Sequence, residues 1–274
     1  MANEQPDYTV IKKDNEFEIR QYTNFLTATV ETEGERDDAI GKGFRILFKY
    51  ISGENKNKES ISMTVPVMQK SIGDNKWNMN TVIIQYNAGN IQSVLYALER
   101  IGMTALVTDD PSLIQSADKV IFPGVGEAST AMQYLKERNL DILIPQLKQP
   151  ILGICLGMQL MCSHSEENDT PCLGIFNEQV QKFTTSEPTL KIPQMGWNTI
   201  CDLKSDLFTS VPENSYAYFV HGYYATLGAQ TIAKTDYILS YSAALQKDNF
   251  YGVQFHPEKS ALVGEQIIKN FIAL

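Results

Sequence analysis

The sequence predicts an α/β protein, in which a mostly parallel open sheet with flanking helices follows a small α+β segment. Two observations lead to this prediction. From Met79 onwards, short apolar runs alternate with amphipathic stretches, as buried parallel strands alternate with helices. Before Met79, apolar and polar residues alternate one by one, which is typical of half-buried strands. We therefore expect two parts, residues 1–78 and 79–274.

The first part is predicted to contain strand, strand, helix and strand. Apolar residues alternate with polar ones around residues 17–19 and 28–30, which indicates two strands. Residues 37–51 place their apolar side chains on one helical face, and the alternation returns at 61–67. With fewer than 80 residues and an open strand edge, this part buries little surface by itself.

The second part repeats strands and helices in the order expected of a parallel sheet. The predicted buried strands are 81–85, 104–107, 119–122 and 150–154. Helices are expected after Asn90, through Met132 and Leu135, and over 263–272. Further hairpin-like strands are expected at 178–183, 191–203, 216–220, 237–242 and 251–255.

Composition narrows the possible functions. The chain has 274 residues and a net charge of −9, which argues against nucleic acid or an anionic membrane as partner. Four cysteines without a C-x-x-C pair, and three histidines, suggest neither a metal site nor a disulfide framework. The most apolar stretch, 150–162, is interrupted by Gln159 and too short to span a bilayer. We expect a cytoplasmic protein without a cofactor.

The string from Gly153 to Gly157 is the strongest sign of chemistry. It lies where an apolar strand ends and a helix begins, and its small residues permit a sharp bend that holds Cys155 up at the carboxyl edge of the sheet. The positive end of the following helix favours the thiolate form of such a cysteine. The alternative is a buried cysteine at an ordinary strand–helix corner.

A second string, Phe255-His256-Pro257-Glu258, supplies the groups that a nucleophilic cysteine needs. In extended backbone, residues two apart point to the same side, so Glu258 can reach one ring nitrogen of His256. The other nitrogen is then free to accept the proton of Cys155, which is the arrangement used in covalent acyl transfer. Alone, the string would be better explained as a solvated turn after a strand, and it is the combination with the cysteine turn that favours a catalytic unit.

A third element, Pro123-Gly124-Val125-Gly126, follows an apolar strand. A tetrahedral intermediate formed from an amide needs backbone donors for its oxyanion. The N–H of Leu156, directly after the nucleophile, is one candidate, and the N–H of Val125 in this loop is the other. The alternative is a plain turn before a helix that begins at Glu127.

With these strings in place, residues 79–274 resemble the class I glutamine amidotransferases. Within that class they resemble the glutaminase subunits of imidazole glycerol phosphate synthases. The matching strings are Ile84 to Asn90, Phe122 to Gly126, Gly153 to Leu160, Pro193 to Asn198, Tyr218 to His221 and Gly252 to Ser260. The resemblance implies that Cys155, His256 and Glu258 release ammonia from glutamine through a glutamyl thioester. It also implies that Gln159 and Glu167 hold the glutamine.

The same resemblance implies a partner, the (β/α)₈-barrel cyclase subunit, which receives the ammonia and forms imidazole glycerol phosphate for histidine biosynthesis. Asn90, Trp197 and Lys259 match positions near that interface. A helix cap, a core aromatic residue and a solvated lysine are the respective structural alternatives. A glutaminase serving another acceptor, such as pyridoxal phosphate synthesis, is a nearer competitor, and the string from Met195 to Asn198 argues against it.

Residues 8–79 resemble the first part of the SOUL haem-binding-protein family. The matching strings are Tyr8 to Lys13, Phe17 to Tyr22, Gly43 to Asn55 and Ile61 to Val67. The resemblance implies a partial domain that lacks its second half, either a remnant or a dimerising appendage. It also implies the alternative function, a tetrapyrrole-binding protein with a passive glutaminase-like half. No histidine precedes His164, so this segment contains no imidazole ligand for haem.

Overall fold

The computed structural model describes residues 8–14, 17–22, 26–30, 80–86, 90–187 and 189–274, and for residues 8–30 only the backbone. The chain divides into two compact units, residues 1–70 and 71–274, which are described separately. The expected boundary between residues 78 and 79 lies outside the described residues and stays a prediction. None of the described helices is long and apolar enough to cross a membrane.

The first unit contains an antiparallel sheet of three strands in the order β1-β2-β3. Their bounds are β1 Tyr8–Asp14, β2 Phe17–Tyr22 and β3 Leu26–Val30. The predicted strands around residues 17–19 and 28–30 are confirmed as β2 and β3. The sequence prediction missed β1, whose pairing with β2 is irregular between Val10 and Lys12. The helix expected at 37–51 and the strand expected at 61–67 lie outside the described residues.

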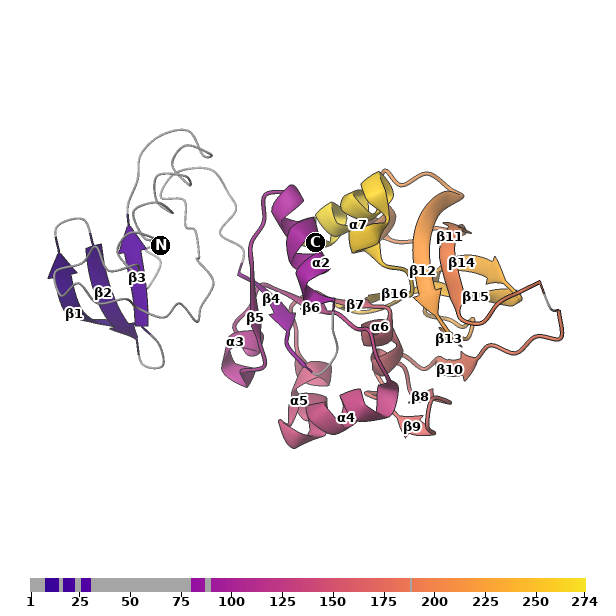
Figure 1. Ribbon diagram of the computed structural model, residues 1–274, viewed down its shortest axis with the longest axis horizontal. Helices are drawn as coiled ribbons and strands as arrows, with labels where there is room; N and C mark the ends of the chain where they lie inside the picture. Colours follow the sequence, from indigo (N-terminus) through magenta and orange to yellow (C-terminus); the bar gives the residue numbers. More distant parts are fainter. Residues whose placement is uncertain (1–7, 15–16, 23–25, 31–79, 87–89, 188) are drawn as a thin grey trace. The chain divides into compact units, whose positions relative to one another are not determined.

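The second unit is built on a seven-stranded sheet in the order β14-β15-β16-β7-β6-β4-β5 (Figure 1). The five strands from β16 to β5 pair in parallel, and β14 and β15 add antiparallel at one edge. Their bounds are β4 Thr81–Ile84, β5 Ala105–Thr108, β6 Lys119–Phe122, β7 Ile151–Ile154, β14 Thr231–Tyr237, β15 Leu239–Lys247 and β16 Phe250–Val253. The predicted mostly parallel open sheet is confirmed.

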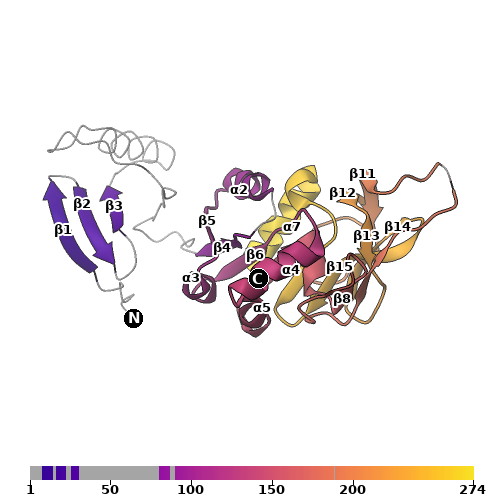
Figure 2. The same cartoon turned by 60° about the horizontal axis from the view of Figure 1, so that its bottom comes forward.

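Helices cover both faces of this sheet (Figures 1 and 2). One face packs against α2 and α7, through a core that includes Ile83, Leu98 and Phe271. The other face packs against α3 to α6, through a core that includes Ile84 and Met132. Because neighbouring strand residues point to opposite faces, Ile83 and Ile84 enter different cores. The helices are α2 Ile91–Arg100, α3 Pro111–Gln115, α4 Ala128–Glu137, α5 Leu140–Leu143, α6 Leu156–Met161 and α7 Ala261–Ala273.

Two smaller sheets lie beside the main one. Four strands pair in the order β13-β10-β8-β9, and β11 forms an antiparallel pair with β12. Their bounds are β8 His164–Ser165, β9 Thr170–Pro171, β10 Gln179–Lys182, β11 Gln194–Ile200, β12 Ser215–His221 and β13 Tyr223–Ala225. Short 3₁₀ turns cover Ile144–Gln146, Asp206–Phe208 and Pro257–Lys259.

The order of the central strands positions the functional residues. Strands β16, β7 and β6 are adjacent and parallel, so their carboxyl ends meet at one edge of the sheet. Directly after β7 stands Cys155, after β6 the loop from Pro123 to Gly126, and after β16 the segment from Gln254 to Glu258. In an open parallel sheet this edge is where ligands bind. The three strings singled out in the sequence therefore converge here.

Candidate active site

Cys155 occupies a strained turn between β7 and α6. Its backbone has φ 53° and ψ −108°, a conformation that side-chain-bearing residues rarely adopt and that lifts the thiol out of the strand. The turn is possible because its glycines allow close backbone approach. A Cβ on Gly157 would lie 1.9 Å from the carbonyl oxygen of Phe122, and one on Gly153 would lie 2.8 Å from the nitrogen of Met158. Both glycines of the Gly-x-Cys-x-Gly string are thus required sterically.

His256 and Glu258 form a buried hydrogen-bonded pair. Nδ1 of His256 lies 2.8 Å from Oε1 of Glu258, and the two side chains are 3% and 1% exposed. The backbone N–H of His256 donates to the carbonyl of Tyr218 at 2.8 Å, and Ser260 Oγ donates to the carbonyl of His256 at 2.7 Å. Since Nδ1 faces the carboxylate and the main chain is held from both sides, Nε2 is the nitrogen available to Cys155.

The electrostatics of this pair favour imidazolium. Burial lowers the pKa of His256, but hydrogen bonds and charges from Cys155 and Glu258 outweigh burial and raise it from 6.5 to about 10. The structure therefore brings together all three predicted catalytic residues, with the imidazole between the thiol and the carboxylate. Such an arrangement can transfer a proton from sulfur to nitrogen and keep the resulting ion pair.

The predicted oxyanion donors are present, but one of them is already engaged. The N–H of Leu156 donates to the carbonyl of Gly124 at 3.4 Å. The peptide between Gly124 and Val125 thus turns its carbonyl toward Leu156. The preceding peptide is anchored, because the hydroxyl of buried Tyr86 donates to the carbonyl of Pro123. Burial, and after it the charge of Cys155, raise the pKa of Tyr86 well above 10, so this hydroxyl keeps its proton.

Gln159 is buried behind the nucleophile. Its Nε2 donates to the carbonyl of Tyr223 and to Oε1 of Gln254, both at 2.9 Å. Gln254 in turn places its own Nε2 3.7 Å from Cys155 Sγ. The sequence prediction missed Gln254. The available signal was its position two residues before His256, on the same side of an extended segment.

Glu167, the other predicted glutamine-binding residue, accepts a hydrogen bond from the backbone N–H of Ala128, the first residue of α4, at 2.8 Å. Partial burial raises the pKa of this carboxyl group, with a contribution from the charge of Glu127. Glu127 caps α4 by accepting from Ser129 and Thr130, as its place at the predicted helix start suggests.

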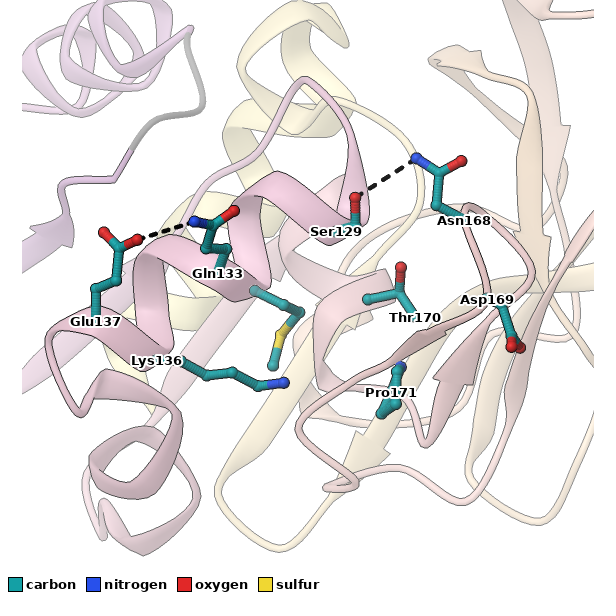
Figure 3. Close-up of a pocket in the computed structure, with 9 residues that line it drawn as sticks. Ser129, Gln133, Lys136, Glu137, Asn168, Asp169, Thr170 and Pro171 are labelled. Carbon is teal, nitrogen blue, oxygen red and sulfur yellow. Dashed lines mark hydrogen bonds between the residues drawn. The ribbon is translucent and has the colours of Figure 1, made fainter.

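A surface pocket of about 390 Å³ lies beside this region, between α4 and β9 (Figure 3). In the figure, Ser129 and Asn168 face each other at one end of the pocket, and Gln133 bonds Glu137 at the other. None of the predicted catalytic residues lines this pocket.

The three residues expected near a partner differ in exposure and in the contacts that they make. Asn90 stands at the N-cap of α2 but makes no side-chain cap, and instead its Nδ2 donates to Glu258 Oε1 at 2.9 Å. Trp197 on β11 is 53% exposed and contacts Tyr218 edge to face, so it is not a core residue. Lys259 is exposed directly after the triad carboxylate. Among the described residues, no cluster of histidine, cysteine, aspartate and glutamate side chains is suited to hold a metal ion.

Comparison with known proteins agrees with this geometry. Residues 82–274 match the family Glutamine amidotransferase class-I, so the fold and the site define a class I glutamine amidotransferase. More narrowly, the chain belongs to the family of the imidazole glycerol phosphate synthase subunit HisH. The HisH of Bacteroides fragilis is 57% identical over 196 residues, covering 72% of this chain and 100% of that protein. The HisH of Blochmanniella floridana is 48% identical over 198 residues, with the same coverage.

Solved structures support the predicted fold class. A putative component of a GMP synthase from Thermoplasma acidophilum has a TM-score of 0.56 at 20% identity, covering 72% of this chain and 94% of that one. PurLQS from Thermotoga maritima has a TM-score of 0.53 at 16% identity, covering 71% and 98%. Separately, residues 3–96 match the family SOUL heme-binding protein, a range that overlaps the amidotransferase match over 82–96.

Proposed function

We propose that this protein is the glutaminase subunit of an imidazole glycerol phosphate synthase and supplies ammonia for histidine biosynthesis in the cytoplasm. The observation that carries the proposal is the constellation at the sheet edge. Cys155 stands on a strained turn at a helix start, and it helps to raise the pKa of an imidazole whose other side, Nδ1, lies 2.8 Å from a buried carboxylate. The family membership supplies the substrate, because HisH is a class I glutamine amidotransferase subunit.

The reaction follows from these positions. His256 Nε2 takes the proton of Cys155, and the sulfur forms a bond to the side-chain amide carbon of glutamine. His256 then returns a proton to the amide nitrogen, which leaves as ammonia and yields a glutamyl thioester. Water attacks the thioester after giving a proton to His256, and the thiolate leaves, so that glutamate is released. Glu258 holds the ring orientation and stabilises the imidazolium formed twice in this cycle.

The conformation of the oxyanion loop does not favour hydrolysis. With the carbonyl of Gly124 facing the N–H of Leu156, the loop places an acceptor where the oxyanion needs donors. Rotation of the peptide between Gly124 and Val125 removes that carbonyl and presents the N–H of Val125 instead. Gly124 permits such a rotation at little steric cost because it lacks a side chain. The resting state of the loop therefore hydrolyses glutamine slowly.

The exposed aromatic surface of the β11–β12 pair fits a subunit interface. Met195, Trp197 and Tyr216 are 67%, 53% and 60% exposed, and exposed methionine and aromatic side chains are typical of docking surfaces. Pairing of β11 with β12 also brings this surface next to Val220, whose carbonyl faces Cys155. We assign this surface to the barrel cyclase subunit, which receives the ammonia directly.

Glutamate release measured with and without the barrel cyclase and its ribotide ligand tests the proposal. Both additions together are expected to raise the rate at least tenfold. Trp197→Ala weakens binding of the barrel cyclase, whereas Ile142→Ala, similarly exposed on α5, leaves it unchanged. A rate that is unaffected by the partner and its ligand contradicts the role in this synthase.

Tetrapyrrole binding is the second candidate, because residues 3–96 match the SOUL family. All three histidines of the chain, His164, His221 and His256, follow this range, so it holds no imidazole ligand. Titration of the full chain with haemin separates the two functions. A saturable shift of the Soret band that persists in His164→Ala supports a haem site in the first unit, and a spectrum matching free haemin excludes it.

A further inference from the structure

Gln254 contacts the nucleophile directly, although it belongs to neither the triad nor the oxyanion loop. It follows β16 and is wholly buried, with its backbone N–H donating to the carbonyl of Ala243 at 2.8 Å. Its side chain ends 3.7 Å from Cys155 Sγ, within the range of a hydrogen bond to sulfur. A glutamine amide presents either a donor or an acceptor, so its effect on the sulfur depends on which end faces it.

The neighbouring groups fix that orientation. The carbonyl of Tyr223 only accepts, so the amide group of Gln159 turns its nitrogen toward it, at 2.9 Å. The same nitrogen has a second hydrogen, which points to Gln254 at 2.9 Å and therefore requires an oxygen there. With its oxygen directed at Gln159, Gln254 has only its NH₂ left for Cys155. Two amides are thus aligned by one backbone carbonyl.

His221 supplies a second donor to the same backbone carbonyl. Nδ1 of His221 lies 2.7 Å from the carbonyl oxygen of Tyr223. Burial lowers the pKa of His221 to about 4, so the ring is neutral and carries one hydrogen. Because a carbonyl only accepts, that hydrogen lies on Nδ1. The carbonyl that aligns the two amides therefore accepts two hydrogen bonds, which hold it in place.

The amide N–H of Gln254 offsets an unfavourable contact of the Cys155 thiolate. The carbonyl oxygen of Val220 lies 3.8 Å from Cys155 Sγ and accepts the hydrogen of the neutral thiol. Once the proton has left, the same oxygen faces a negative sulfur and disfavours it. An N–H donor opposite this carbonyl offsets that cost, and more strongly so in a buried site than in water.

We propose that Gln254 is a catalytic residue, whose amide N–H donates to the Cys155 thiolate and whose donor orientation is set by Gln159. The bond stabilises the thiolate before it attacks the substrate, and again when the same sulfur leaves the thioester. The catalytic consequence rests on the proposed glutaminase activity, whereas the hydrogen bond to the thiolate does not.

Alkylation of Cys155 by iodoacetamide tests this bond without involving glutamine or the oxyanion donors. The full-length protein is reacted over a range of pH, and the modified peptide is quantified by mass spectrometry. Gln254→Met keeps the length of the side chain and removes the donor. We expect alkylation near neutral pH to slow about tenfold, as for loss of a hydrogen bond to a charged group, with an unchanged limiting rate at high pH.

Further variants distinguish whether Gln254 acts as a hydrogen-bond donor or only fills space. Gln254→Glu keeps the shape and the contact with Gln159 but puts an oxygen beside the sulfur, so it slows alkylation more than methionine does. Gln246→Met, the same substitution on β15 where the amide donates to Tyr251, leaves the rate unchanged. Gln159→Met reproduces part of the loss and is not additive with Gln254→Met.

An alkylation profile that is identical in the wild type and both Gln254 variants overturns the proposal. Full additivity of the Gln159 and Gln254 substitutions overturns the assigned orientation. If alkylation responds as expected while the wild type releases no glutamate, the hydrogen bond stands and the proposed function fails.

Discussion

Replacing Glu258 by glutamine removes a charge from the site while keeping its shape. Glu258 Oε1 accepts from both His256 Nδ1 at 2.8 Å and Asn90 Nδ2 at 2.9 Å. An amide oxygen accepts the same two hydrogen bonds, so the ring keeps its position. What the variant loses is the negative charge that stabilises imidazolium, in a side chain only 1% exposed.

The size of this loss follows from the pKa of His256. Burial lowers that pKa, and the contacts with Cys155 and Glu258 raise it to about 10, against an ordinary value of 6.5. At about 1.4 kcal/mol per pKa unit, the net preference for imidazolium is roughly 5 kcal/mol. Glu258→Gln keeps the hydrogen bond but removes its charge, and the loss of a charged hydrogen-bond partner costs about 1.5–3 kcal/mol, or roughly ten- to a hundredfold in kcat/KM for glutamine.

Glutamate release in the presence of the barrel cyclase and its ligand measures this effect. Glu265→Gln, at an exposed ion pair with Lys269 on α7, is the matched control and should leave kcat/KM unchanged. If Glu258→Gln retains kcat/KM within about threefold while its thermal unfolding matches the wild type, the charge of Glu258 does not support His256 and the reasoning fails.

The same pair makes stability depend on pH. The pKa of His256 is raised in the folded state, so its contribution to the free energy of unfolding is fully present below about pH 6.5 and is lost as the pH rises through about 10. Glu258→Gln should therefore flatten the alkaline loss of stability in urea unfolding. An equally steep alkaline loss in the variant contradicts this contribution.

Three further predictions concern the surroundings of the triad. Gly157→Ala places a Cβ 1.9 Å from the carbonyl oxygen of Phe122, so urea unfolding should show a loss of about 1–3 kcal/mol or more, and an unchanged midpoint refutes the steric argument. Tyr86→Phe leaves the buried carbonyl of Pro123 without its donor, so we expect a loss of about 1–3 kcal/mol together with a lower kcat in the presence of the partner; wild-type values for both would show that this hydroxyl anchors nothing. The pKa of His221 is lowered by burial from 6.5 to about 4, so stability falls by up to about 3 kcal/mol as the pH drops from about 6.5 to 4, because the unfolded chain binds the proton first. A His221→Gln variant should lose that part of the acid sensitivity, and the prediction is wrong if its pH profile parallels that of the wild type.

Much of the fold was predictable because local patterns were strong. Four short apolar runs predicted β4 to β7 to within a residue or two. Strands β4, β6 and β7 are fully buried, and strands buried on both faces of a parallel sheet contain little else, whereas β5 at the edge is only half-buried. β14 was missed because Thr231–Tyr237 mixes polar and apolar residues without regular alternation, at the edge of the sheet. The pairing of short strands such as β8 and β9 depends on contacts that no local pattern encodes.

The same distinction holds for the candidate site. Cys155 lies between glycines whose spacing predicts a tight turn. Glu258 lies two residues after His256, a spacing that predicts side chains on the same side of an extended segment. Asn90 was predicted to lie near a partner or to cap a helix, but its hydrogen bond to Glu258 was not predicted. That bond joins residues 168 positions apart, and the bond of Gln254 to Cys155 joins residues 99 positions apart. Such contacts arise only when β16, β7 and the start of α2 are assembled, so the sequence alone does not reveal them.

The central claim is that Cys155 is the nucleophile of a glutaminase, and replacing the two cysteines of this region tests it most directly. Cys155→Ala and Cys162→Ala each remove one thiol, on the strained turn and at the end of α6 respectively. Glutamate release is measured for both with the barrel cyclase and its ligand present. The account predicts at least a roughly thousandfold loss for Cys155→Ala and a rate near wild type for Cys162→Ala. Hydrolysis that survives in Cys155→Ala would contradict the account.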